Sequence, residues 1–323
     1  ILCNSAGVLK MENKPNQHYV WQKYLEPWIQ DGKIACLRNK NKIIQTNPRN
    51  IASERYFYKI NNLTQNDCNL IRRIFIDYIP EPIRSLLEGW VRPVEEFLEL
   101  YNFAEAFYNY SDEGKELIED FKDRQLKNLL ENLHMNIENN GMPGLCRMQS
   151  GDLAFLFECD DESDEDVDFI LYLSFQYFRT KKIKQSVKES LGEHASVFTD
   201  FDDAFNLIVP ILSTVFGNSV LNHIKCNEFY CYLINNNTDI SFITGDQPVI
   251  NIHANFEKNG ETSELELYYP LSPALSLLIT KEKNYNIECS REKVKEYNDI
   301  IERQSFTMIF AYDESDLLQY IQD

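Results

Sequence analysis

Three polar residues of one predicted helix are spaced so that their side chains could act together. Glu131, His134 and Glu138 are three and four positions apart, which places all three on one face of a helix. A Glu and a His three apart is a ligand spacing of carboxylate-bridged metal sites in helical bundles, but those sites need a second such helix, and we find none in the sequence. The alternative is a solvated or pairing face near a helix end that binds no metal.

A further acid, Asp246, lies where a predicted strand is interrupted. The run 240–243 is apolar, Gly245 and Pro248 punctuate its end, and a second apolar run, 249–252, follows at once. Asp246 would then be held at the rim of a sheet, where exposed loops on rigid strands often carry binding or catalytic side chains. It could equally tie two strand ends together.

The charge of the chain is negative overall but unevenly distributed. The 323 residues have a net charge of −19, which argues against unspecific binding to a phosphate backbone, yet residues 1–60 hold ten Lys or Arg against four acids. Either this basic segment docks on its own acidic body, or it marks a local site for a nucleotide or the end of a nucleic acid. The acidic remainder could contact a basic protein partner.

Length and composition are typical of a folded protein with a sizeable core. Apolar residues make up 43% of the chain. The eight cysteines form no CxxC pair, which is typical of reduced thiols in the cytosol, and no apolar run reaches the roughly 18 residues of a membrane span. We therefore expect a cytoplasmic protein without a membrane partner. We interpret residues 1–10, ahead of Met11, as an extension.

The elements that must position the polar residues change in type along the chain. Strand-like patterns occupy both ends, with a hairpin of 33–37 and 42–46 near the start. Pro80, Pro82 and Pro93 are expected to break the helical pattern, and Asn139-Asn140-Gly141 to close its longest helix. The predicted helices are 64–79, about 112–140, 165–190, 201–224, 291–304 and 314–322. The predicted late strands are 229–233, 241–244, 249–252, 265–269, 276–279 and 307–312.

An acidic run between Glu158 and Asp168 could suggest a calcium loop. It lacks the central Gly and the terminal Glu of an EF-hand, so we interpret it as a helix start, with Ser163 and Asp166 as a capping box.

Strands at both ends with helices between them predict an α+β fold: a mixed or antiparallel sheet built from both chain ends, with a central helical insertion. We expect a single domain over 11–323. Its parts are an N-terminal hairpin part (14–60), a helical part (64–225) and a C-terminal sheet part (226–323).

A series of short motifs resembles the domain-of-unknown-function 4238 family of bacterial proteins, over residues 15–313. The motifs are His18-Tyr19-Val20-x-Gln22-x-Tyr24-Leu25, Ile51-Ala52-Ser53-Glu54-x-x-Phe57-Tyr58, Glu131 with Glu138, Phe175-Gln176-x-x-Arg179-Thr180, Phe242-Ile243-Thr244-Gly245-Asp246-x-Pro248-Val249, Tyr269-Pro270-Leu271-Ser272-Pro273 and Asn298. This chain has Gly245 where the family often has Ser, and Tyr269 where Phe is usual. His134 is not part of the family pattern. The family name implies no activity, so the resemblance narrows the residues but not the reaction.

The residues that the resemblance selects could converge only through folding. They are His18, Gln22, Glu54, Glu131, Glu138, Gln176, Arg179 and Asp246. Carboxylates from Glu54, Asp246 and either Glu131 or Glu138 could bind Mg²⁺ or Mn²⁺ and activate water. His18 would be a general base or a ligand, and Arg179 would clamp a phosphate, with Gln22 and Gln176 contacting the substrate.

Two functional hypotheses follow from this set. The first is a bacterial hydrolase, a metal-dependent phosphodiesterase or nuclease-like effector, for which the kind of family suggests a role in defence against phage. The second is a non-catalytic interaction protein, such as a partner, inhibitor or regulatory subunit, in which the same residues form a buried polar network. The sequence has no P-loop, no G-x-G-x-x-G and no G-x-S-x-G elbow. An open pocket lined by the set would favour the first hypothesis, and a closed surface over it the second.

Overall fold

The computed structural model describes residues 15–108, 112–157, 164–254, 262 and 264–322. The expected extension at 1–10 lies outside these ranges, as do Ser163 and most of the acidic run that contains it.

The first sheet joins the two ends of the chain. Strands β2 (Ile34–Arg38) and β3 (Lys42–Thr46) form the predicted hairpin, and β10 (Met308–Ala311) pairs with β2 on one side and with β6 (Thr244–Gly245) on the other. The strand order is β3-β2-β10-β6, and every pairing is antiparallel. This confirms the prediction of an antiparallel sheet built from both chain ends.

A second sheet and a short ribbon complete the strands. The second sheet has the order β5-β9-β8-β7, formed by β5 (Tyr230–Asn235), β7 (Ile250–Asn251), β8 (Leu267–Ser272) and β9 (Leu275–Thr280). The ribbon pairs β1 (Asn16–His18) with β4 (Ser53–Arg55). Helix α7 (Arg291–Gln304) contacts β6, and Tyr297 of this helix stacks on Tyr268 of β8 at 4.2 Å between ring centroids.

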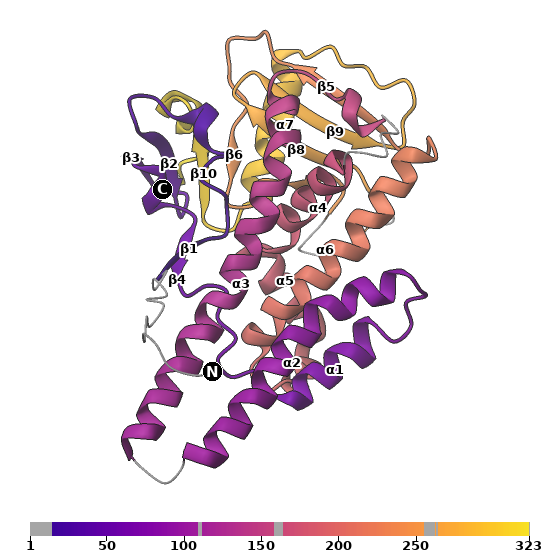
Figure 1. Ribbon diagram of the computed structural model, residues 1–323. Helices are drawn as coiled ribbons and strands as arrows, with labels where there is room; N and C mark the ends of the chain where they lie inside the picture. Colours follow the sequence, from indigo (N-terminus) through magenta and orange to yellow (C-terminus); the bar gives the residue numbers. More distant parts are fainter. Residues whose placement is uncertain (1–14, 109–111, 158–163, 255–261, 263, 323) are drawn as a thin grey trace, which may run out of the picture.

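Helices fill the middle of the chain and pack against one another between the sheets and the far end of the molecule (Figure 1). They are α1 (Gln65–Phe75), α2 (Ile83–Tyr108), α3 (Asp112–Gln149), α4 (Glu165–Phe178), α5 (Lys181–Leu191) and α6 (Phe201–Lys225). Local signals place several of their starts. Thr64 caps α1 in a complete capping box with Asp67, and Ser290 caps α7 by accepting from the Lys293 N–H.

Two predicted helix boundaries were wrong. Pro93 lies inside α2, and α3 continues through Asn139-Asn140-Gly141 to Gln149. The glycines that look like a helix stop are instead points of contact with α4. A Cβ at Gly141 would lie 2.4 Å from Tyr172 Cβ, and one at Gly144 would lie 2.7 Å from Phe169 Cβ. The absence of a side chain lets α3 and α4 touch, and this packing outweighs the local preference of glycine for a helix end.

The predicted helix 165–190 is two helices. Helix α4 ends with Arg179 as its C-cap, and Thr180 begins α5 by accepting a hydrogen bond from the Ile183 N–H. The break matters for the site described below, because it turns the chain immediately after the Arg179 side chain. The last predicted helix, 314–322, is a pair of short 3₁₀ turns, Glu314–Asp316 and Leu318–Tyr320.

One helix among the described residues, α6, is long and apolar enough to cross a membrane by those two criteria alone. Most of its apolar stretch is buried inside the protein, and core helices of water-soluble proteins meet the same criteria.

Candidate functional site

A pocket of about 240 Å³ gathers most of the residues selected from the sequence. It is lined by His18, Trp21, Gln22, Lys23, Glu131, His134, Glu138 and Arg179, and we refer to it as the His134 pocket. Three separate parts of the chain contribute: the turn that follows β1, the middle of α3 and the C-cap of α4. The predicted convergence of distant polar residues is therefore present for five of them: His18, Gln22, Glu131, Glu138 and Arg179.

The ribbon carrying His18 is fixed to α3 by a neighbouring amide. Gln17 is fully buried, its Nε2 donates to the Lys127 carbonyl at 2.7 Å, and its Oε1 accepts from the Tyr58 N–H at 2.8 Å. The Tyr58 hydroxyl donates to the His18 carbonyl at 2.9 Å. The backbone next to His18 is therefore held on both sides before any ligand enters.

His18 itself is held by its neighbours. The Nε2 atoms of Gln22 and His18 lie 2.5 Å apart, and an amide nitrogen can only donate, so the neutral ring carries its proton on Nδ1. Burial is the main reason that the pKa of His18 is lowered; the Ile51 backbone opposes this shift and the Arg179 cation adds to it. His18 is thus a neutral, oriented imidazole at neutral pH.

His134 is the imidazole with free nitrogens. Its side chain is only 2% exposed, and neither Nδ1 nor Nε2 has a hydrogen-bond partner among the described residues. The ring lies against Tyr58, with centroids 4.0 Å apart, and meets Phe175 edge-on at 5.3 Å. Burial and, secondarily, Arg179 hold the pKa of His134 well below its ordinary value, so the ring is neutral. A buried imidazole without partners costs about 1–3 kcal/mol per unpaired group, which a ligand would recover.

Arg179 and Glu138 form a buried ion pair at the side of the pocket. Arg179 Nη2 donates to Glu138 Oε1 at 2.5 Å, and the two residues are 2% and 8% exposed. Burial raises the pKa of Glu138, while Arg179 opposes that shift. Arg179 stays protonated: burial lowers its pKa, but Tyr58 and Glu138 raise it by more. Its Nε has no partner among the described residues, so one donor of the guanidinium remains for a ligand.

Three selected residues do not line this pocket. Glu54 is exposed and pairs with Lys181 at 2.5 Å. Asp246 is buried and accepts from the backbone N–H groups of Phe306, Thr307 and Met308 and from the Thr307 hydroxyl, at 2.6–3.0 Å. Gln176 is fully buried, and neither atom of its amide group has a hydrogen-bond partner among the described residues. The structure therefore places Glu54 and Asp246 outside the site predicted for them. Glu54 is held by its ion pair with Lys181, and Asp246 by its hydrogen bonds to residues 306–308.

A family model described as a protein of unknown function (DUF4238) matches residues 16–315, nearly the whole chain. The chain belongs to this family. No curated protein and no solved structure matches the chain. The chemistry of this DUF4238 protein is therefore inferred from the positions and contacts of its own side chains.

The metal site predicted for this DUF4238 protein is not assembled. Glu54 and Asp246 lie elsewhere, and within the described ranges no three His, Cys, Asp or Glu side chains are grouped closely enough to share one ion. Of the donors that remain in the pocket, Glu138 is held in the ion pair with Arg179, His18 is bonded to Gln22, and His134 lies in an aromatic niche. The residues do not fit the expected Mg²⁺ or Mn²⁺, and we derive no chemistry through a metal.

Three residues that line the pocket were not among the predicted site residues: Trp21, Lys23 and His134. Trp21 is half-buried and meets Tyr172 edge-on at 5.6 Å while lining the pocket. Lys23 adds a cation at the rim. His134 was set aside because it is not part of the family pattern, although its spacing from Glu131 and Glu138 was the correct signal for a shared helix face.

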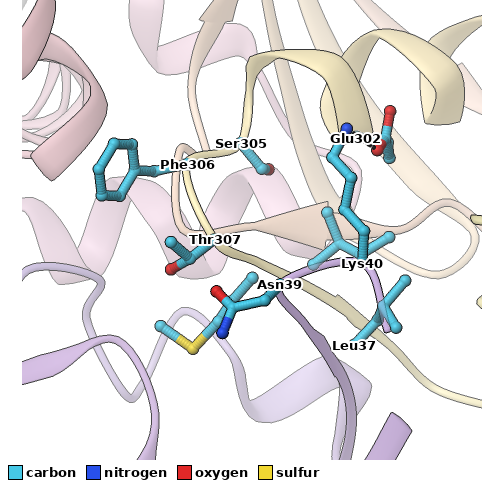
Figure 2. Close-up of a pocket in the computed structure, with 9 residues that line it drawn as sticks. Leu37, Asn39, Lys40, Glu302, Ser305, Phe306 and Thr307 are labelled. Carbon is cyan, nitrogen blue, oxygen red and sulfur yellow. Dashed lines mark ion pairs between the residues drawn. The ribbon is translucent and has the colours of Figure 1, made fainter. Parts of the chain in front are cut away.

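A different hollow, at the turn between β2 and β3, has a volume of only about 30 Å³, roughly the share of one water molecule. Figure 2 shows the Lys40–Glu302 ion pair on one side of it, with the Phe306 ring pointing away from that pair. This hollow is too small for a substrate.

Proposed function

We propose that this protein is a phosphoester hydrolase whose substrate binds in the His134 pocket. One observation carries the proposal: a pocket lined by polar groups from three parts of the chain, in which the Arg179 Nε and both His134 nitrogens have no partner among the described residues. Unpaired polar groups are rarely retained in a folded interior unless a ligand, an ion or water completes them.

The proposed roles follow from charge and from available hydrogen bonds. Arg179 binds a non-bridging phosphoryl oxygen through Nε, and Lys23 adds positive charge at the rim. His134 takes a proton from the attacking water as the new P–O bond forms, then returns it to the leaving oxygen as the old P–O bond breaks. An anionic phosphate close to His134 would raise the pKa of the imidazole toward neutrality, where proton transfer is most efficient.

His18 is a positioning residue in this proposal rather than the base expected from the sequence. Gln22 occupies its Nε2, and the Ile51 backbone lies beside the ring. Glu138 fixes the orientation of the guanidinium of Arg179.

The test is hydrolysis of bis(p-nitrophenyl) phosphate, RNA, DNA and nucleotides, each with added Mg²⁺, with added Mn²⁺ and with a chelator. We expect His134→Phe and Arg179→Lys to lower kcat/KM by about 10²–10³-fold, as is typical when a preorganised catalytic group is lost. The matched control is His194→Phe, which changes an exposed histidine and should retain full activity.

Absence of hydrolysis by the parent protein under every condition, or full activity of His134→Phe, would exclude this mechanism. Absence of hydrolysis would favour the second hypothesis, a non-catalytic interaction protein in which the Glu138–Arg179 ion pair is a structural link. Activity that the chelator abolishes would restore the metal-dependent prediction. The role in phage defence stays a prediction that no feature of the described residues addresses.

A further inference from the structure

A second hollow, of about 320 Å³, collects positive charge in a strongly acidic protein. It lies between the segment that begins at β4, helix α5 and the first turns of α6. Five cations line it, against the three carboxylates of Glu54, Asp202 and Asp203. We call this the basic groove, and its cations are Arg55, Lys59, Lys181, Lys184 and Lys188.

The lysines of α5 form one ridge along the groove. Positions 181, 184 and 188 follow a spacing of three and four, so the three side chains share one face of the helix. Arg55 and Lys59 come from the basic segment at residues 1–60, whose excess of positive charge is evident from the sequence alone. Folding thus adds part of that segment to an independent lysine ridge.

This charge is only partly neutralised, by Asp203 in the wall of the groove, by Asp200 close to Lys59 and Lys184, and by two ion pairs. Lys181 pairs with Glu54 at 2.5 Å and Lys188 with Asp202 at 3.3 Å, but both pairs are partly exposed, and such pairs contribute little and exchange readily. Among the described residues, no carboxylate lies within ion-pair distance of Arg55, Lys59 or Lys184. Of the three acids, Asp203 faces inward and accepts from the Asn62 N–H at 2.8 Å.

Lys184 is the least solvated cation of the groove. Its Nζ donates to Asn206 Oδ1 at 3.0 Å and lies 4.6 Å from the centroid of the Phe57 ring. Burial lowers the pKa of Lys184 to about 8, even though Asp202, Glu54 and other acids raise it. Two of its three N–H donors remain for an anion, whose charge would favour the protonated amine.

An exposed aromatic ring lies at the edge of the same groove. Phe306 is 42% exposed and lines both the basic groove and an adjoining hollow of about 560 Å³. In Figure 2 the ring points away from the small hollow at Lys40 and Glu302. Cations beside an exposed aromatic face are the features that proteins use to hold a phosphate and stack the base attached to it.

We propose that the basic groove binds the phosphate groups of a nucleotide or of a single-stranded nucleic-acid end, with a base stacked on Phe306. The groove would recognise the phosphate and the aromatic base rather than a particular sequence, because every nucleotide offers a phosphate and a base that can stack. Binding here does not depend on hydrolysis in the His134 pocket, so either proposal can fail alone.

The test is fluorescence anisotropy of the full chain with a 3′-labelled, 5′-phosphorylated oligothymidylate of about 12 nucleotides, at low salt. We expect saturable binding that Lys59→Gln and Phe306→Ala each weaken about five- to tenfold. The matched control is Lys42→Gln, which removes a cation of the same N-terminal segment from β3, outside the groove, and should change affinity less than about twofold. Lys59 and Lys42 are both exposed, so neither substitution threatens folding.

Competitors identify the source of the phosphate. Displacement of the oligonucleotide by AMP indicates a mononucleotide site, and displacement by a longer strand only indicates a nucleic-acid end; both support the proposal. Each lost cation should also reduce the slope of log affinity against log salt by about one.

The proposal would be overturned if the parent protein shows no saturable binding, or if Lys42→Gln weakens the affinity as much as Lys59→Gln. It would also be overturned if inorganic phosphate displaces the oligonucleotide and Phe306→Ala has no effect on affinity. Binding that His134→Phe abolishes would also overturn it, because the ligand would then occupy the other pocket. The parent affinity retained by His134→Phe, together with loss in Lys59→Gln, is the expected outcome.

Discussion

Asp246 and His134 are both buried polar residues, and their surroundings are opposite. The Asp246 carboxylate accepts four hydrogen bonds, three of them from consecutive backbone N–H groups at 306–308. The His134 imidazole has no hydrogen bond to any described residue, and it faces a pocket. The Asp246 carboxylate is satisfied within the fold, whereas in our proposal a ligand completes the hydrogen bonds of the His134 ring.

Burial alone does not separate these two cases, and a missing partner alone does not either, because the Gln176 amide is also buried without partners and does not line the His134 pocket. A charge held by several N–H donors secures a chain segment, in this case the start of β10 against β6. A polar ring with unused nitrogens lowers stability unless a ligand or water completes its hydrogen bonds, and the ring of His134 lines a pocket. The comparison can be tested by removing one group at a time.

The largest effect is expected at Asp246. Asp246→Ala would leave three backbone N–H groups without their acceptor, and we expect the free energy of unfolding to fall by about 4 kcal/mol or more. Urea unfolding followed by circular dichroism measures it. The matched control is Asp313→Ala, which removes an exposed cap on the Ser315 N–H and should cost about 1 kcal/mol. Equal effects of the two substitutions would contradict the special role of Asp246.

The next effect concerns the ion pair that borders the pocket. Glu138→Leu would leave the Arg179 guanidinium buried without its partner and lower the free energy of unfolding by about 3 kcal/mol. The double variant Glu138→Leu/Arg179→Met removes both charges and should regain most of that loss. A double-mutant cycle in urea measures the coupling, and simple additivity would show that the two side chains act independently.

A smaller effect depends on pH. The pKa of His134 is lowered in the folded protein and ordinary, near 6.5, in the unfolded chain, so the unfolded state binds more protons below pH 6.5. His134 should therefore reduce stability as the pH falls below about 6.5, by up to about 1.4 kcal/mol per pH unit, and contribute no pH dependence above it.

The difference between the parent protein and His134→Phe isolates this contribution, because His18, whose pKa is also lowered, is present in both. Urea unfolding between about pH 5 and pH 7.5 should show a shallower acid loss for the variant. Parallel curves would mean that His134 titrates normally in the folded state.

The smallest effect on stability is expected at neutral pH from the same substitution. A phenyl ring of similar shape has no nitrogens to leave unpaired. We therefore expect His134→Phe to leave the free energy of unfolding unchanged or to raise it by at most about 1 kcal/mol, measured by thermal unfolding. Its hydrolytic activity should be lost all the same. Destabilisation by more than about 2 kcal/mol would show that the ring is as structural as Asp246.

Local signals in the sequence predicted much of the fold. The hairpin at 33–46 and the helix starts near 64 and 291 depend on residues a few positions apart, and the structure has them. The helix boundary predicted at Gly141 was wrong because packing between helices overrides the local signal, and Pro93 also lies inside a helix. The contact that keeps Gly141 helical involves Tyr172, which no local pattern connects to it.

The site was predicted only in part, for a similar reason. Family motifs brought His18, Glu131 and Arg179 to attention, but Asp246 belongs to a motif of the same quality and has a different role. The hydrogen-bond donors to Asp246 lie about 60 positions later, at 306–308. The sequence alone therefore does not show that the Asp246 carboxylate is fully hydrogen-bonded. Conversely, His134 lies outside the family pattern, and only the structure reveals its free nitrogens.

The glycines at which α3 touches α4 have one more consequence. Gly141 lies a single turn beyond Glu138, and its neighbour Tyr172 lies two turns before Arg179, so the close contact between α3 and α4 lies near the ion pair on both helices. A ligand that binds beside that ion pair contacts two closely packed helices, α3 and α4. Recognition should therefore need little rearrangement, and the entropy lost on binding should be small compared with that of a site closed by a moving lid.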